Sequence, residues 1–210
     1  MAASAESVVR PAEALFTGKA LAYAPAMGHR PDDSALMLRY QDGDMAAFET
    51  LYRRHNDPLY RYLLRLCRNR DTAEDLFQDV WGKIVKARTS YRPTAKFTTF
   101  LYRVAHNCFI DHVRRNKRHV GGGGLDVDLQ PHPGESLETT TERSKARQRL
   151  ATELLALPDE QRDVFLLHEE ASLSLDEIAS VTGCNRQTAK SRLRYARKKL
   201  LAAIDESPER

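Results

Sequence analysis

Seven lysines and arginines lie between Ile178 and Leu200, a stretch that contains no aspartate or glutamate. Their spacing favours one helix, because four apolar residues recur at intervals that place them on one narrow stripe. The expected buried stripe consists of Ala189, Leu193, Ala196 and Leu200. The opposite face would meet a polyanion such as DNA with little self-repulsion. The charges alone also suit an ordinary solvated helix, so the prediction depends on the neighbouring elements.

Aromatic and basic residues alternate in a second stretch, between Lys96 and Arg118. Aromatic rings stack on unpaired bases while cations hold the phosphates, so this composition suits single-stranded nucleic acid. Aromatic residues at helical spacing are also common in protein cores, and both interpretations stay open for each ring. The polar residues Thr98, Thr99 and Asn107 are unusual company for a purely apolar face.

A third stretch predicts an amphipathic helix with an acidic outer face. Apolar residues recur from Leu76 to Ile84, and Asp71 with Glu74 has the spacing of a capping box at the helix start. The outward residues are Asp75, Gln78, Asp79 and Lys83. A solvated acidic face near a helix N-terminus is one interpretation, since the helix dipole favours it. A docking surface for a basic partner is the other.

Patterns of catalytic or metal-binding residues are missing from the sequence. The group His106, Cys108, His112 and His119 matches no zinc-ligand spacing, and there is no phosphate-binding glycine loop or nucleophile elbow. We therefore expect no catalytic residues, no metal and no cofactor. Three widely spaced cysteines argue against a disulfide framework and favour a reducing compartment, the cytoplasm.

The elements around the basic helix predict a helix-turn-helix. Ser174 and Glu177 have the spacing of a capping box, which marks the start of a short helix. Gly183 can adopt the positive φ angle of a tight turn, and Asn185 is a good N-cap for the basic helix. Earlier in the chain, Asp32 or Asp33 and then Asp44 are expected caps, and Pro58 either kinks or restarts the helix around it.

The helical periodicities along the chain predict an all-α fold with two small helical domains. At 210 residues and 41% hydrophobic content the chain can form packed cores, and its pI is near 9.0. Residues 120–141 are rich in Gly, Pro, Thr and acidic residues, which predicts a flexible linker. The expected parts are a mobile extension at 1–31, a domain at 32–119, this linker, and a helix-turn-helix domain at 142–205. No signal peptide or membrane-inserting segment is expected.

Two separate blocks of the sequence resemble bacterial RNA polymerase sigma factors of the extracytoplasmic-function (ECF) group. The block DTAEDLFQDVWGKIVKA and the following KFTTFLYRVAHNCFIDHVRR resemble sigma region 2. The block LPDEQRDVFLLHEEASLSLDEIASVTGCNRQTAKSRLRYARKKL resembles sigma region 4. The resemblance covers roughly residues 33–204 in the expected order, and the short linker distinguishes the chain from the larger primary sigma factors.

The resemblance implies a role for each block. Polymerase contacts are implied for Asp75, Gln78, Asp79 and Lys83. Contacts with the minus-ten promoter element are implied for Phe97, Phe100, Arg103, Asn107, Arg114 and Arg115. Contacts with the minus-thirty-five element are implied for Arg186, Gln187, Lys190, Ser191, Arg192, Arg194, Tyr195 and Arg197.

The expected partners are therefore core RNA polymerase, promoter DNA and an anti-sigma protein, with no enzymatic activity in the chain itself. Two other classes stay open. A stand-alone helix-turn-helix regulator would bind specific duplex DNA without polymerase. A nucleic-acid-processing enzyme would need a metal or nucleophile site.

Overall fold

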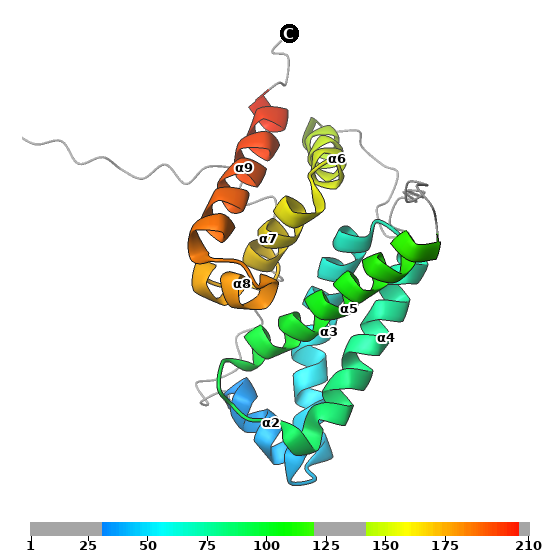
Figure 1. Cartoon of the computed structure of the whole chain (residues 1–210), viewed down its shortest axis with the longest axis vertical. Helices are drawn as coiled ribbons and strands as arrows, with labels where there is room; N and C mark the ends of the chain where they lie inside the picture. The colour runs from blue at the N-terminus through cyan, green and yellow to red at the C-terminus, as the bar shows by residue number, and fades with distance from the viewer. Residues whose placement is uncertain (1–30, 120–141, 206–210) are drawn as a thin grey trace, which may run out of the picture.

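A computed structural model describes residues 31–119 and 142–205, and within these ranges every regular element is a helix (Figure 1). This confirms the predicted all-α class. The helices are α2 (Asp33–Gln41), α3 (Met45–Cys67), α4 (Arg70–Lys86), the short 3-10 helix η1 (Ala87–Ser90), α5 (Phe97–His119), α6 (Glu142–Leu155), α7 (Asp159–Glu169), α8 (Leu175–Thr182) and α9 (Arg186–Asp205). The predicted linker at 120–141 and most of the predicted extension at 1–31 lie outside the described residues.

The first four α-helices pack around one apolar core. The side chains of Asp32 and Asp44 accept hydrogen bonds from the first backbone N–H groups of α2 and α3, as expected of N-caps. Pro58 lies inside α3, which continues through it as one helix, so the proline does not restart the chain. The core is made of residues such as Leu51, Leu63 and Ile84, which are fully buried.

The predicted cap of α4 is wrong. The N-cap is Asn69, whose side chain accepts a hydrogen bond from the backbone N–H of Thr72 at 2.8 Å, and Asp71 lies in the first helical turn. The carboxylate of Glu74 is instead paired with Arg70 at 2.8 Å. An asparagine two residues upstream therefore takes the place that the sequence pattern assigned to Asp71.

The remaining helices form the predicted helix-turn-helix unit. Ser174 and Glu177 make both bonds of a capping box at the start of α8, and Gly183 ends that helix with φ of 68°. Asn185 accepts a hydrogen bond from the backbone N–H of Thr188 at 2.7 Å as α9 begins. The predicted apolar stripe of α9 is buried at all four positions, Ala189, Leu193, Ala196 and Leu200.

The two helical units contact each other directly. In Figure 1 α8 lies beside the N-terminal half of α5, and α7 also packs against α3. Asp163 of α7 is buried at this interface, with 4% of its surface exposed. One of its oxygens accepts a hydrogen bond from Tyr62 at 2.7 Å, and the other lies 2.8 Å from Nδ1 of His106. The interface is thus built around polar groups from three helices.

Within the described ranges, no helix combines the length and apolar character needed to cross a membrane.

Candidate nucleic-acid and protein interfaces

The outer face of α9 carries basic side chains that face solvent. Lys190, Arg194 and Lys198 are exposed, and each lacks an ion-pair partner among the described side chains, those of residues 31–116 and 148–203. The guanidinium of Arg194 stacks over the ring of Tyr195 at 5.2 Å, and that ring is 52% exposed. Gln187 is also exposed and Ser191 is half-buried. The backbone of a duplex could therefore be held without breaking existing ion pairs.

Three other predicted arginines of this helix-turn-helix are already paired with acids. Arg186 lies 3.1 Å from Asp176, Arg197 lies 3.0 Å from Glu169, and Arg192 pairs with Glu160 of α7. The side chain of Arg192 is only 25% exposed. Arg192 is therefore oriented towards α7 by the protein itself, whereas Lys190 and Arg194 are available to a ligand.

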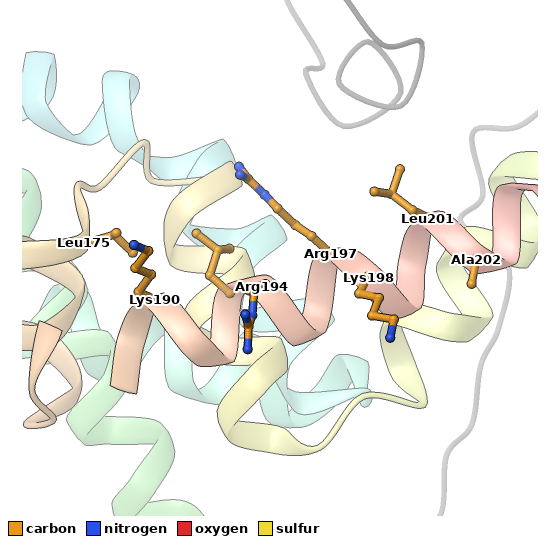
Figure 2. Close-up of a pocket in the computed structure, with 8 residues that line it drawn as sticks. Leu175, Lys190, Arg194, Arg197, Lys198, Leu201 and Ala202 are labelled. Carbon is orange, nitrogen blue, oxygen red and sulfur yellow. The ribbon is translucent and has the colours of Figure 1, made fainter. Parts of the chain in front are cut away.

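A shallow open pocket runs along this helix (Figure 2). Its lining combines apolar side chains with cations: Leu175, Lys190, Leu193, Arg194, Arg197, Lys198, Leu201 and Ala202. Figure 2 shows Arg194 and Lys198 extending from one side of α9, and Arg197 and Leu201 from the other. The sequence places Lys198 on the face opposite the buried stripe, where it continues the spacing of Lys190 and Arg194, although it is not among the contacts that the resemblance implies.

The predicted residues of α5 fall into two groups. In the first half of the helix, Phe97 is 1% exposed and packs against the rings of His55 and Tyr91. Phe100 is half-buried against Tyr91, with ring centroids 5.3 Å apart. Phe97 therefore belongs to the core in this conformation, where no base can reach it. A place in the core is one of the two interpretations that its helical spacing left open.

Three predicted residues further along α5 face solvent. Asn107, Arg114 and Arg115 are exposed, and among the described side chains Arg114 has a weak ion-pair contact with Asp111 at 3.8 Å. Arg103, one turn before Asn107, is half-buried because its guanidinium donates a hydrogen bond to Ser180 of α8 at 2.6 Å. The structure therefore brings part of the predicted strand-binding surface into contact with the helix-turn-helix unit.

The acidic face of α4 is exposed as expected. Asp75, Gln78, Asp79 and Lys83 all face solvent, while Leu76, Val80 and Ile84 are buried on the opposite side. These four polar residues recur at helical spacing, so they form one continuous surface that a partner helix could contact.

Glu177 makes contacts outside its own helix that the sequence did not indicate. Its Oε2 atom accepts bonds from the backbone N–H and the hydroxyl of Ser174, while Oε1 lies 3.1 Å from the ammonium of Lys96 and accepts a hydrogen bond from Thr99 at 3.2 Å. Partial burial opposes ionisation, but the bonds from Ser174 and Lys96 outweigh it and lower the pKa of Glu177 to about 2. The capping-box motif predicted the first set of bonds; the second joins segments 78 residues apart, which local spacing cannot reveal.

These features define a two-part, all-helical protein with a helix-turn-helix and two further polar surfaces. Residues 51–119 match the family model of Sigma-70 region 2, and residues 147–200 match that of Sigma-70, region 4. The RNA polymerase sigma factor YlaC of Bacillus subtilis is 31% identical over 168 residues, which cover 78% of this chain and 95% of the relative. The ECF RNA polymerase sigma factor SigM of Mycobacterium tuberculosis is 30% identical over 184 residues, which cover 86% of this chain and 90% of SigM. The chain belongs to the ECF group of RNA polymerase sigma factors, which confirms the resemblance.

Solved structures agree on the fold. The sigma factor RpoE from Bartonella quintana, in complex with the anti-sigma factor NepR, superposes with a TM-score of 0.63 at 24% identity, covering 77% of this chain and 98% of that one. CnrH, in complex with the cytosolic domain of CnrY, superposes with a TM-score of 0.60 at 23% identity. The match covers 84% of this chain and 99% of CnrH. The fold of this chain therefore occurs in solved structures.

Proposed function

We propose that this chain is a dissociable specificity subunit that binds core RNA polymerase through α4, contacts the melted minus-ten strand through α5 and anchors the minus-thirty-five duplex through α9. The single observation that carries the proposal is the presence of all three surfaces, in order, on a chain of the ECF family. Each surface has chemistry that matches its partner.

The proposed duplex contacts centre on Lys190, Arg194 and Tyr195. Their exposure and the absence of ion-pair partners among the described side chains support this role, because phosphate contacts position a helix in the major groove for reading bases. Arg186 and Arg197 would exchange their acidic partners for phosphates. Gln187 and Ser191 lie on the same face and can hydrogen-bond base edges.

The proposed contacts with the non-template strand lie on the outer face of α5. Asn107, Arg114 and Arg115 are accessible as the molecule stands. Phe100 and Arg103 would become accessible once α8 moves away. Phe97 supports the surface from inside the core, so we leave it out of the proposed direct contacts.

The remaining proposals follow from family membership. The complex of RpoE with the anti-sigma factor NepR supports an anti-sigma partner for this chain. RNA synthesis would be catalysed by polymerase and not by this chain, and its place of action would be the cytoplasm, where polymerase and its template are found.

The test is run-off transcription with purified core polymerase on genomic promoter fragments. We expect initiation that depends on this chain and falls strongly with Gln78→Ala/Asp79→Ala, because both side chains are removed from the exposed face of α4. The matched control is Glu49→Ala/Arg53→Ala, which removes an exposed ion pair on α3 and should leave initiation unchanged. Absence of initiation, together with tight duplex binding by the chain alone, would identify a stand-alone regulator instead.

A further inference from the structure

A strip of apolar side chains along α3 and α4 is open to solvent. The two helices run side by side (Figure 1), and the strip is formed by Met45, Phe48 and Tyr52 of α3 with Phe77, Trp81 and Val85 of α4. Met45 is 61% exposed, Val85 44% and Tyr52 36%. The strip is continuous, because the ring of Trp81 lies 4.8 Å from that of Tyr52 and 5.8 Å from that of Phe48. Contiguous apolar patches of this kind commonly mark a binding surface.

The strip borders the acidic face of α4. Val85 follows Gln78 by seven residues, so the two side chains lie on the same side of that helix, two turns apart. Asp75 and Asp79 are exposed on the same face and make the border of the strip negative. A ligand on the strip would therefore cover one edge of the proposed polymerase-binding face.

The chain that precedes the described residues begins beside α3. The guanidinium of Arg54 donates a hydrogen bond to the carbonyl oxygen of Pro31 at 2.8 Å, and Asp32 caps α2. Residues 25–30 can span up to roughly 20 Å when extended, which exceeds the diameter of a helix with its side chains, about 10–12 Å. Residues before 25 can therefore reach the strip from Pro31.

The sequence of residues 8–24, VVRPAEALFTGKALAYA, has the composition of a ligand for such a strip. Leu15, Phe16 and Tyr23 recur at intervals that a helix would place on one side. Its charged residues are two cations, Arg10 and Lys19, and one acid, so its net charge is opposite to that of the α4 border. Apolar side chains with a basic border match an apolar strip with an acidic border.

We propose that residues 8–24 of this chain dock on the strip formed by α3 and α4. The docking is a property of the free chain and does not depend on the proposed function. Its consequence does rest on that function: the docked segment shields part of the polymerase-binding face of α4, so the chain regulates its own access to core polymerase.

The first experiment detects docking by paramagnetic broadening of amide signals in the full-length chain. A nitroxide is attached at Ala20→Cys in a Cys184→Ser background, because Cys67 and Cys108 are buried. We expect the amides of Met45, Tyr52 and Val85 to lose intensity, while those of Lys190 and Lys198 on α9 keep theirs. No loss at the strip, or an equal loss on α9, would overturn the proposal.

Matched variants carrying the same label test the two sides of the contact. Leu15→Asp/Phe16→Asp should restore the strip signals, whereas Ala14→Asp/Thr17→Asp adds the same charge and should leave them broadened. On the strip, Met45→Glu should also restore them, and the first turn of α3 tolerates an acid there. Leu38→Glu, at an exposed leucine of α2 outside the strip, is its control. Equal effects within either pair would overturn the proposal.

A mixed sample decides between docking within one chain and association of two copies. Isotope-labelled chain without nitroxide is combined with nitroxide-labelled chain at natural isotope abundance. We expect no broadening in this sample. Loss of the strip signals would identify a second copy as the ligand and overturn docking within the chain.

The last experiment measures affinity for core polymerase by anisotropy of fluorescein at the exposed position Ala202→Cys in the same background. If the segment is docked for about nine-tenths of the time, Leu15→Asp/Phe16→Asp should bind on the order of ten-fold more tightly, because apparent affinity follows the competent fraction. Ala14→Asp/Thr17→Asp should bind like the wild type. Equal affinities of all three chains would overturn the shielding. If none of them binds polymerase, the proposed function fails, while the amide signals still decide the docking.

Discussion

At the scale of single residues, the structure separates side chains that are available from those already in use. On α9, Lys190 faces solvent while Lys199 bonds to the backbone of Ala156 and lies 3.8 Å from Glu153. On α5, Arg115 faces solvent while Arg103 is held by Ser180. The sequence shows all four as equivalent cations, and only their surroundings distinguish their roles.

Lys190→Ala should weaken duplex binding at every promoter sequence. Loss of one phosphate contact should reduce the slope of log affinity against log salt by about 0.9, because one fewer counterion is released. The measurement is a salt titration of binding to a minus-thirty-five duplex. Lys199→Ala is the control, since its side chain is directed to α6, and an equal change of slope in both variants would reject Lys190 as a specific phosphate contact.

Glu177 should make stability depend on acidity. Because the pKa of its carboxyl is lowered to about 2 in the folded chain, its contribution is complete above the ordinary value of 4.5 and is lost as pH falls towards 2. Glu177→Gln should therefore unfold at lower temperature than the wild type at pH 6, and this difference should shrink by pH 3. Thermal unfolding at both pH values tests this, and a difference that does not change with pH would contradict it.

At the scale of elements, motifs with local geometry were predictable and contacts between distant segments were not. The capping box of Ser174, the turn at Gly183 and the buried stripe of α9 follow from spacing alone. The cap of α4 was predicted wrongly because Asn69 and Asp71 are both good capping residues and the pattern does not rank them. The place of Phe97 depends on which face of α5 the core covers, which is decided by α2 and α3 packing against it.

Two glycines give opposite predictions when changed to alanine. Gly183→Ala should destabilise the turn before α9 by about 1 kcal/mol, because alanine is strained at a φ of 68°. Gly82→Ala, in the middle of α4 with open space around the new methyl group, should stabilise that helix by about 0.5–1 kcal/mol. Amide hydrogen exchange resolved by helix measures both, and slower exchange in α8 and α9 of Gly183→Ala would contradict the first.

At the scale of the whole molecule, a few buried polar groups join two helical units whose buried apolar residues belong to one cluster. Asp163 and Glu170 of the second unit each accept bonds from two residues of the first. Burial and the nearby charge of Asp163 raise the pKa of Tyr62 well above its ordinary value, so its hydroxyl remains a donor at physiological pH. No sequence pattern marks these pairs, because their partners lie 57 to 109 residues apart.

Asp163→Ala should separate the two units. The change leaves the Tyr62 hydroxyl and the His106 ring without their shared acceptor, and each orphaned buried group costs ~1–3 kcal/mol. We expect a larger radius of gyration by small-angle scattering, with Tyr62→Phe showing a smaller increase. Binding of a minus-thirty-five duplex serves as the folding control, and an unchanged radius with intact duplex binding would show that Asp163 does not hold the units together.

The two carboxylate oxygens of Glu177 bond to different partners, and this determines how α8 can move away from α5. When Oε1 releases Lys96, Oε2 keeps its bonds to Ser174, so α8 retains its cap and need not unwind. The molecule with α8 packed on α5 and the molecule with α8 moved away would then have the same helical content and give the same circular dichroism spectrum. Such a rigid-body motion falls in the microsecond-to-millisecond range of hinged domains and avoids the slower refolding of a helix. A promoter strand would then meet a surface that is already folded and needs only to be uncovered.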